Sequence, residues 1–149
     1  MSGFGQDPLR CLIVDDNREF AENLAEIIED LGEEPVVAND GRSAIVALEK
    51  GAFELLLCDF RMPEMNGAEV IREAKRIQPS LRAVIVSAYA NDAELAEATT
   101  MGAMAILPKP IPMAALKNLL ARPPKSDAVA ARRFFGFRLP AAAPQRTKA

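Results

Sequence analysis

The chain of 149 residues contains no histidine and only two cysteines. Without imidazole, the protein is no histidine phosphate carrier, no zinc site built on histidine and no serine–histidine hydrolase. Cys11 and Cys58 each lie within an apolar run, and two cysteines are too few for a disulfide framework or a metal cluster. We therefore predict that both are reduced thiols in the core.

Long apolar stretches are also missing. No segment is long and apolar enough to cross a bilayer, and residues 1–8 lack the basic and apolar parts of a signal peptide. We therefore expect a cytoplasmic protein without a membrane span. Because 50% of the residues are hydrophobic and 26% are charged, the chain has material for one domain with a core.

Charge divides the chain into unequal parts. Up to Ala121 there are 20 acidic and 11 basic residues, a net charge of −9, whereas residues 122–149 hold seven basic residues and one acidic residue, a net charge of +6. We expect a flexible N-terminus at 1–8, a domain at 9–121 and a basic tail rich in Ala, Pro and Arg at 122–149.

Strand and helix patterns alternate along residues 9–121. Short apolar runs predict five strands, and apolar residues at helical spacing predict a helix after each strand. The expected strands lie at 11–14, 35–38, 55–59, 83–86 and 103–107, and the helices end near Gly32, Gly51, Pro79, Gly102 and Pro123. This order favours an α/β fold with a doubly wound, five-stranded parallel sheet and helices on both faces.

Polar residues follow four of these strands at the point where each ends. Right-handed crossovers would bring the strand ends to one edge of the sheet, with Asp15, Asp16, Asp59, Ser87 and Lys109 along it. Crowded carboxylates repel one another, and oxygen ligands favour Mg²⁺. We therefore predict a divalent metal site at which one carboxylate attacks phosphorus. Lys109 and Ser87 would then contact the phosphoryl oxygens.

The same residues resemble the receiver domain of two-component response regulators. The resemblance spans roughly residues 9–121 and rests on Asp15-Asp16, Asp59-Phe60-Arg61-Met62-Pro63, Gly67, Ser87-Ala88, Gly102-Ala103 and Lys109-Pro110, in that order. It implies the flavodoxin-like fold of receivers and a single-domain response regulator. Such a protein is no enzyme beyond catalysing its own phosphorylation and dephosphorylation.

The resemblance implies a role for each residue of the site. Asp59 would accept a phosphoryl group from a sensor histidine kinase or a histidine phosphotransfer protein. Asp16 would bind Mg²⁺ directly and Asp15 mainly through water, with Asp59 and the backbone carbonyl of Arg61 as further ligands. Lys109 would pair with the phosphoryl group.

Three positions are expected to act in switching. The resemblance implies that the hydroxyl of Ser87 moves inward to hydrogen-bond the phosphoryl group. Family members commonly have an aromatic residue where this chain has Ile106, so Tyr89 is a candidate gate over the site instead. Because Arg61 and Tyr89 are bulky, we expect slow hydrolysis of the phosphoryl group.

Partners of two kinds are expected for the domain. The resemblance implies that the kinase or phosphotransfer protein binds the first helix, and that a downstream protein target binds the fourth helix, fifth strand and fifth helix. Residues 122–149 are too short for a DNA-binding output domain, so we expect none. We expect a disordered, solvated tail. Its segment 132–139 is the exception, because phenylalanines interleaved with arginines suit docking on an acidic partner, a lipid surface or nucleic acid.

The sequence is compatible with other functions. One alternative is a phosphate sink or phosphorelay shuttle, and another is a degenerate receiver that binds a partner without phosphorylation. A haloacid dehalogenase-type phosphatase would need a second aspartate where Arg61 stands. A flavodoxin-like cofactor site would need a loop rich in Gly, Ser or Thr where Asp15-Asp16-Asn17 stands.

Overall fold

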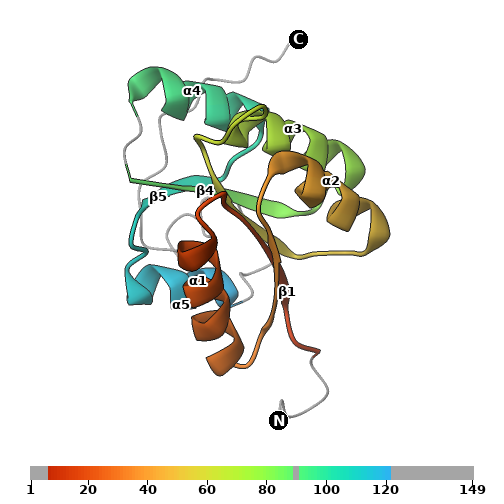
Figure 1. Cartoon of the computed structure of the whole chain (residues 1–149), viewed down its shortest axis with the longest axis vertical. Coiled ribbons are helices and arrows are strands. Elements are labelled where there is room, and N and C mark those ends of the chain that lie inside the picture. The colour runs from red at the N-terminus through yellow and green to blue at the C-terminus, as the bar shows by residue number, and fades with distance from the viewer. Residues whose placement is uncertain (1–6, 89–90, 122–149) are drawn as a thin grey trace.

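The computed structural model describes residues 7–88 and 91–121, in which strands and helices alternate (Figure 1). The strands are β1 (Arg10–Val14), β2 (Glu34–Ala38), β3 (Leu55–Asp59), β4 (Arg82–Ser87) and β5 (Ala105–Pro108). The helices are α1 (Arg18–Asp30), α2 (Gly41–Lys50), α3 (Gly67–Ile77), α4 (Asp92–Met101) and α5 (Met113–Leu120). Within the described part of the chain, no helix combines the length and apolarity needed to cross a membrane. The expectations for the tail and for Tyr89 lie outside the described residues.

The five strands form one parallel sheet in the order β2-β1-β3-β4-β5. Helices α1 and α5 cover one face, and α2, α3 and α4 cover the other (Figure 1). The predicted doubly wound sheet is therefore confirmed. Because the strand order reverses beside β1, the C-terminal ends of β1 and β3 lie next to each other, which is where open α/β sheets bind ligands.

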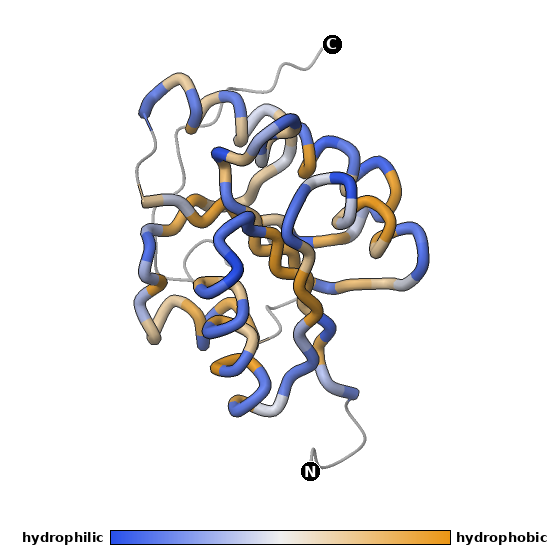
Figure 2. The backbone as a smooth tube through the Cα atoms, in the orientation of Figure 1, coloured by the Kyte–Doolittle hydropathy of each residue, from blue (hydrophilic) through white to orange (hydrophobic). Residues whose placement is uncertain are grey.

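β3 holds the two halves of the core together, since all five of its residues are buried. Leu55 and Leu57 pack under α1 and α5, whereas Leu56 and Cys58 pack under α2, α3 and α4. Burial of each leucine side chain contributes about 1.5–3 kcal/mol of transfer free energy. Apolar segments run through the middle of the sheet (Figure 2), and the burial of both faces fixes the strand that ends at Asp59.

Cys11 and Cys58 are buried free thiols, as predicted. Burial raises the pKa of the Cys11 thiol from 9.0 to about 12 and the pKa of Cys58 well above its ordinary value. Both side chains therefore act as small apolar groups in the core.

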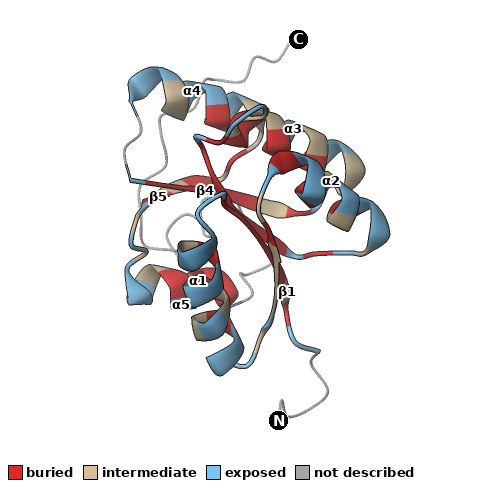
Figure 3. Ribbon diagram, viewed as in Figure 1, coloured by how far each residue is buried: buried red, intermediate tan, exposed pale blue. Residues whose placement is uncertain are grey.

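The helices present buried faces to the sheet and exposed faces to solvent (Figure 3). Four of them begin at a side-chain cap: Asn17, Asp40, Asn66 and Asn91 each accept a hydrogen bond from a backbone N–H in the first turn. Each cap stands in the loop after a strand. The caps therefore start the helices close to the C-terminal edge of the sheet.

β5 begins at Ala105, two residues later than the predicted start at 103. The reason is the end of α4, where Gly102 adopts a φ of 118° and the Ala103 N–H donates a 2.9 Å hydrogen bond to the Ala98 carbonyl. Ala103 therefore still belongs to the end of α4, although its apolar side chain is typical of a buried strand.

Gly67, the first residue of α3, lies directly against the end of β3. Its N–H donates a 2.7 Å hydrogen bond to the Phe60 carbonyl. A Cβ atom here would lie 2.5 Å from the Asp59 carbonyl oxygen and 2.9 Å from the Phe60 Cα atom. Because both atoms belong to backbone, α3 can start this close to the end of β3 only with glycine.

We predict that Gly67→Ala lowers the free energy of unfolding by about 1–3 kcal/mol, because backbone atoms cannot give way to the added methyl group. Gly41→Ala is the matched control, since Gly41 also begins a helix but its added Cβ would meet the flexible side chain of Met65. Urea unfolding of the two variants measures the difference. Equal stabilities for both variants would contradict the steric argument.

Candidate functional site

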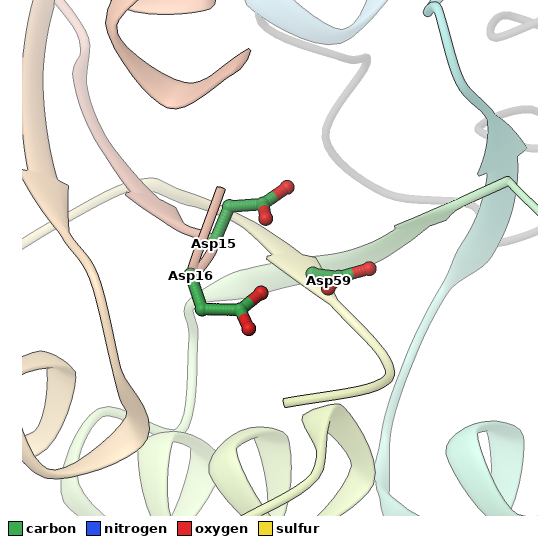
Figure 4. Close-up of side chains that lie close together, drawn as sticks. All are labelled: Asp15, Asp16 and Asp59. Carbon is green, nitrogen blue, oxygen red and sulfur yellow. The ribbon is translucent and has the colours of Figure 1, made fainter. Parts of the chain in front are cut away.

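Three carboxylates gather at the C-terminal edge of the sheet, where β1 and β3 end (Figure 4). Asp15 and Asp16 follow β1, and Asp59 is the last residue of β3. Each side chain offers an oxygen atom, and these oxygens all lie within 4.8 Å of one another. Asp15 and Asp59 are buried, whereas Asp16 is exposed. The three carboxylates therefore form one acidic cluster with a side open to solvent.

Lys109 connects two of these carboxylates from the loop after β5. Its Nζ atom lies 2.8 Å from Oδ2 of Asp15 and 3.4 Å from Oδ1 of Asp59. Burial by itself would lower the pKa of Lys109, but the hydrogen bond to Asp15 and the negative charge of Asp59 raise it overall. The ammonium group therefore stays charged and bridges the ends of β1 and β3.

Phe20 is a member of the site that the sequence pattern did not identify. Its ring, on the first turns of α1, lies 4.6 Å from Nζ of Lys109 (ring centroid to nitrogen), which is a cation–π distance. In the sequence, Phe20 is only one of the apolar residues that recur at helical spacing after the first strand. No local signal connects it with a lysine at the other end of the domain.

Asp15 is held by several hydrogen bonds besides the ion pair. Its Oδ1 accepts a 2.9 Å hydrogen bond from the Asn17 backbone N–H, and its own backbone carbonyl accepts one of 3.0 Å from Nδ2 of Asn39. The side chain is only 2% exposed. The carboxylate is thus fixed before any ligand arrives.

The surroundings of Asp59 shift its pKa upward. Burial, and then the negative charge of Asp15, raise its pKa from 3.8 to about 6, and this exceeds the opposing effect of Lys109. One ammonium group therefore does not neutralise three crowded carboxylates. A divalent cation would relieve the remaining repulsion, and the all-oxygen donor set fits a hard cation such as Mg²⁺ or Ca²⁺.

The side chain of Arg61 extends away from the cluster to α4. Its Nε and Nη2 atoms each lie 2.9 Å from a different carboxylate oxygen of Glu94, which makes a bidentate pair. The hydrogen bond and charge of Glu94 raise the pKa of Arg61, and the same hydrogen bond lowers the pKa of Glu94. Glu94 is a second residue that the sequence pattern did not connect with the site.

Ser87 and Ile106 lie near the same edge. Ser87 is the buried last residue of β4, one position beyond Val86, which pairs with Asp59. Ile106 is partly buried, pairs with Ile85 and packs into the core under α2, α3 and α4. The structure therefore collects all the sequence-predicted positions at this edge or beside it, except Tyr89, which lies outside the described residues.

The raised pKa of Asp59 makes stability depend on pH in metal-free buffer. Between pH 3.8 and about 6 the folded protein keeps a proton that the unfolded chain releases, so stability falls as the pH rises through this window. Asp59→Asn cannot ionise. After allowance for solvent screening, we predict that it raises the free energy of unfolding by roughly 1 kcal/mol at pH 8 and by little at pH 4.

Urea unfolding of Asp59→Asn and the wild type in EDTA, at pH 4 and pH 8, measures this difference. A stabilisation of the same size at both pH values would show that ionisation of Asp59 is not its cause.

The sequence matches the response regulator receiver domain family over residues 11–121. Similar proteins include a response regulator receiver protein of Anaeromyxobacter sp. (strain Fw109-5), 46% identical over 110 residues, which are 74% of this chain and 46% of that protein. The transcriptional regulatory protein ZraR of Escherichia coli K12 is 33% identical over 105 residues, which are 70% of this chain and 24% of that protein. The chain thus spans less than half the length of these curated relatives.

Solved structures share the fold. A response regulator of Burkholderia pseudomallei, crystallised with a phosphorylated aspartic acid, a calcium ion and citrate, is 26% identical with a TM-score of 0.71, over 76% of this chain and 66% of that chain. A CheY-like receiver domain protein of Methanospirillum hungatei JF-1 is 27% identical with a TM-score of 0.72, over 76% of this chain and 94% of that chain. The family match covers most of the chain, and the fold agrees with it. The chain therefore belongs to the response regulator receiver domain family.

Proposed function

We propose that this chain is a phosphoacceptor response regulator, phosphorylated on Asp59 by a sensor histidine kinase or a histidine phosphotransfer protein. The observation that carries the proposal is the cluster of Asp15, Asp16 and Asp59, bridged by Lys109, at the strand ends of a receiver fold. The related Burkholderia structure, which contains a phosphorylated aspartic acid, supports it.

Asp59 is the proposed nucleophile. Its position at the end of a strand buried on both faces presents the carboxylate in one orientation, so little freedom is lost on attack. An Asp59 oxygen forms the new bond to phosphorus as the bond between phosphorus and the donor's histidine nitrogen breaks. The donor histidine comes from the partner, because this chain has none.

Lys109 is proposed to stabilise the phosphoryl oxygens. Its Nζ atom already lies 3.4 Å from Asp59 and stays protonated through its bond to Asp15. A fixed positive charge beside the attacked phosphorus stabilises the negative charge that builds up on the transferred group. The hydroxyl of Ser87, at the end of the neighbouring strand, is proposed as a second donor to these oxygens.

A Mg²⁺ ion is proposed to bind the acidic cluster. Asp16 and Asp59 would hold it with the backbone carbonyl of Arg61, and Asp15 mainly through water. Bound there, the ion would neutralise charge on the carboxylates and on the incoming phosphoryl group. The mutual proximity of the three carboxylates and the raised pKa of Asp59 support this assignment.

Two surfaces are proposed for partners. The kinase or phosphotransfer protein would approach α1, which begins beside the acidic cluster and brings Phe20 to Lys109. A downstream protein target would bind α4, β5 and α5. We propose that the chain catalyses no reaction beyond its own phosphorylation and dephosphorylation.

We predict that the wild type incorporates phosphate from acetyl phosphate only with Mg²⁺, and that Asp59→Asn abolishes labelling. Lys109→Gln should slow labelling about 100-fold, because it removes the fixed charge beside the transferred group. Lys117→Gln, at an exposed lysine of α5, is the control and should label like the wild type. Phosphate-affinity electrophoresis or intact mass measures the labelled fraction.

Labelling of Asp59→Asn at the wild-type rate would contradict the assignment of the phosphoacceptor. A folded wild type that is never labelled would contradict the proposed function itself and favour a receiver that binds its partner without phosphorylation.

Asp16→Asn is predicted to weaken Mg²⁺ binding about tenfold or more, since it removes a charged ligand from the open side of the cluster. Titration calorimetry measures the dissociation constant directly, without any phosphorylation. Asp30→Asn, an exposed carboxylate at the far end of α1, is the control and should leave metal affinity unchanged. Unchanged affinity in Asp16→Asn would contradict its role as a ligand.

A further inference from the structure

Four residues around the lysine of the site form a closed circuit of contacts. Nζ of Lys109 binds Oδ2 of Asp15 at 2.8 Å, and Oδ1 of the same carboxylate accepts a 2.9 Å hydrogen bond from the Asn17 N–H. Oδ1 of Asn17 accepts a 3.0 Å hydrogen bond from the Phe20 N–H, and the Phe20 ring centroid lies 4.6 Å from Nζ of Lys109. The circuit therefore joins the lysine after β5, the loop after β1 and the first turn of α1.

The ring of Phe20 is held in this circuit in two ways. The cap at Asn17 fixes the backbone of the first turn of α1, and the Phe20 side chain is partly buried against the part of the core under α1 and α5. That part of the core includes Leu107 of β5, two residues before Lys109. The ring and the lysine are thus both anchored to the same packed interior.

The two carboxylate partners of Lys109 hold it unequally. Its Nζ atom lies 2.8 Å from Asp15 but 3.4 Å from Asp59, so the closer partner is not the proposed phosphoacceptor. A lysine ammonium is a point charge on a flexible four-carbon stem, and its position depends on the groups around it. A contact that keeps the ammonium near Asp59 without binding it to Asp15 would therefore matter for phosphorylation.

The Phe20 ring is a contact of this kind. The face of an aromatic ring attracts a cation through its quadrupole, but the ring has no net charge that would compete with a phosphoryl group for the ammonium. The attraction therefore remains when phosphoryl oxygens replace a carboxylate as partners of Nζ. An apolar ring beside Nζ also keeps water away from it, and a charge in a drier site stabilises a neighbouring anion more strongly.

We propose that Phe20 is a positioning residue, whose ring holds the ammonium group of Lys109 beside Asp59 and shields it from water during phosphorylation. The inference rests on the proposed function and extends it to a residue that acts only through the lysine. The ammonium must stay in a fixed place because the negative charge of the transferred group builds up on oxygens whose positions are fixed by the attack of Asp59.

The rate of labelling by acetyl phosphate and Mg²⁺ tests the proposal in the wild type, in Phe20→Leu, in Lys109→Gln and in the double variant. Leucine keeps apolar bulk on the helix but has no ring. Phe20→Leu should slow labelling roughly two- to tenfold when Lys109 is present. It should leave the slow labelling of Lys109→Gln unchanged, because glutamine carries no charge for the ring to hold. A general loss of stability would slow labelling in both backgrounds.

Two further variants make the comparison specific. Phe20→Tyr, which retains the ring, should label within about twofold of the wild type. Phe53→Leu is the matched control, because Cζ of Arg10 lies 4.4 Å from the Phe53 ring centroid, but this contact lies before β3, at the opposite end of the strands. Phe53→Leu should therefore label like the wild type.

Proton NMR of the unphosphorylated protein observes the contact itself. Protons over the face of an aromatic ring resonate upfield of their usual position, so the Cε protons of Lys109 should be shifted upfield in the wild type. Phe20→Leu should remove this shift, whereas Phe20→Tyr should keep it. Lys109→Gln identifies the resonance, because the signal is absent from that variant.

The two sets of measurements separate the possible failures. If Phe20→Leu labels at the wild-type rate, if it slows labelling equally with and without Lys109, or if the Lys109 protons show no upfield shift, the positioning role is overturned and the phosphoacceptor function stands. If the folded wild type is never labelled, the proposed function fails and the positioning role fails with it.

Discussion

The site depends on the contact of one lysine with two carboxylates at the edge of the sheet. Lys109 supplies one positive charge for the carboxylates of Asp15, Asp16 and Asp59, and it binds two of them directly. The cluster therefore keeps a net negative charge, and burial, together with the charge of Asp15, raises the pKa of Asp59. An edge with this imbalance favours a divalent cation and, with it, the electrophilic phosphorus of a phosphoryl donor.

Crowding carboxylates costs stability, and the two halves of the core offset that cost. β3 contributes leucines to both halves, so the strand that carries Asp59 is buried on both faces. Gly67 then lets α3 begin against the same strand end, which leaves the Asp59 backbone little room to move. The apolar interior thus holds an electrostatically unfavourable arrangement in place, as functional sites commonly require.

Anchoring of the helices is uneven around this site. α3 is packed into the core along its length, whereas α4 is held by Ala98, by its caps and by the pair between Arg61 and Glu94. α4 therefore depends more than α3 on polar contacts at its first turn.

Much of this protein could be predicted from its sequence, because a parallel sheet brings the residues after each strand to one edge. Apolar periodicity was enough to locate the strands and helices, and the polar residues that follow the strands were enough to bring Asp15, Asp59 and Lys109 together. The apolar pattern predicted the start of β5 two residues too early. Ala103 is apolar, as a buried strand residue would be, but its N–H donates the hydrogen bond that completes the end of α4. The contact of Lys109 with Phe20 and the pair of Arg61 with Glu94 were decided only by the tertiary structure. These partners lie far apart in sequence, and their distances depend on how α1 and α4 pack on the sheet, which no local periodicity encodes.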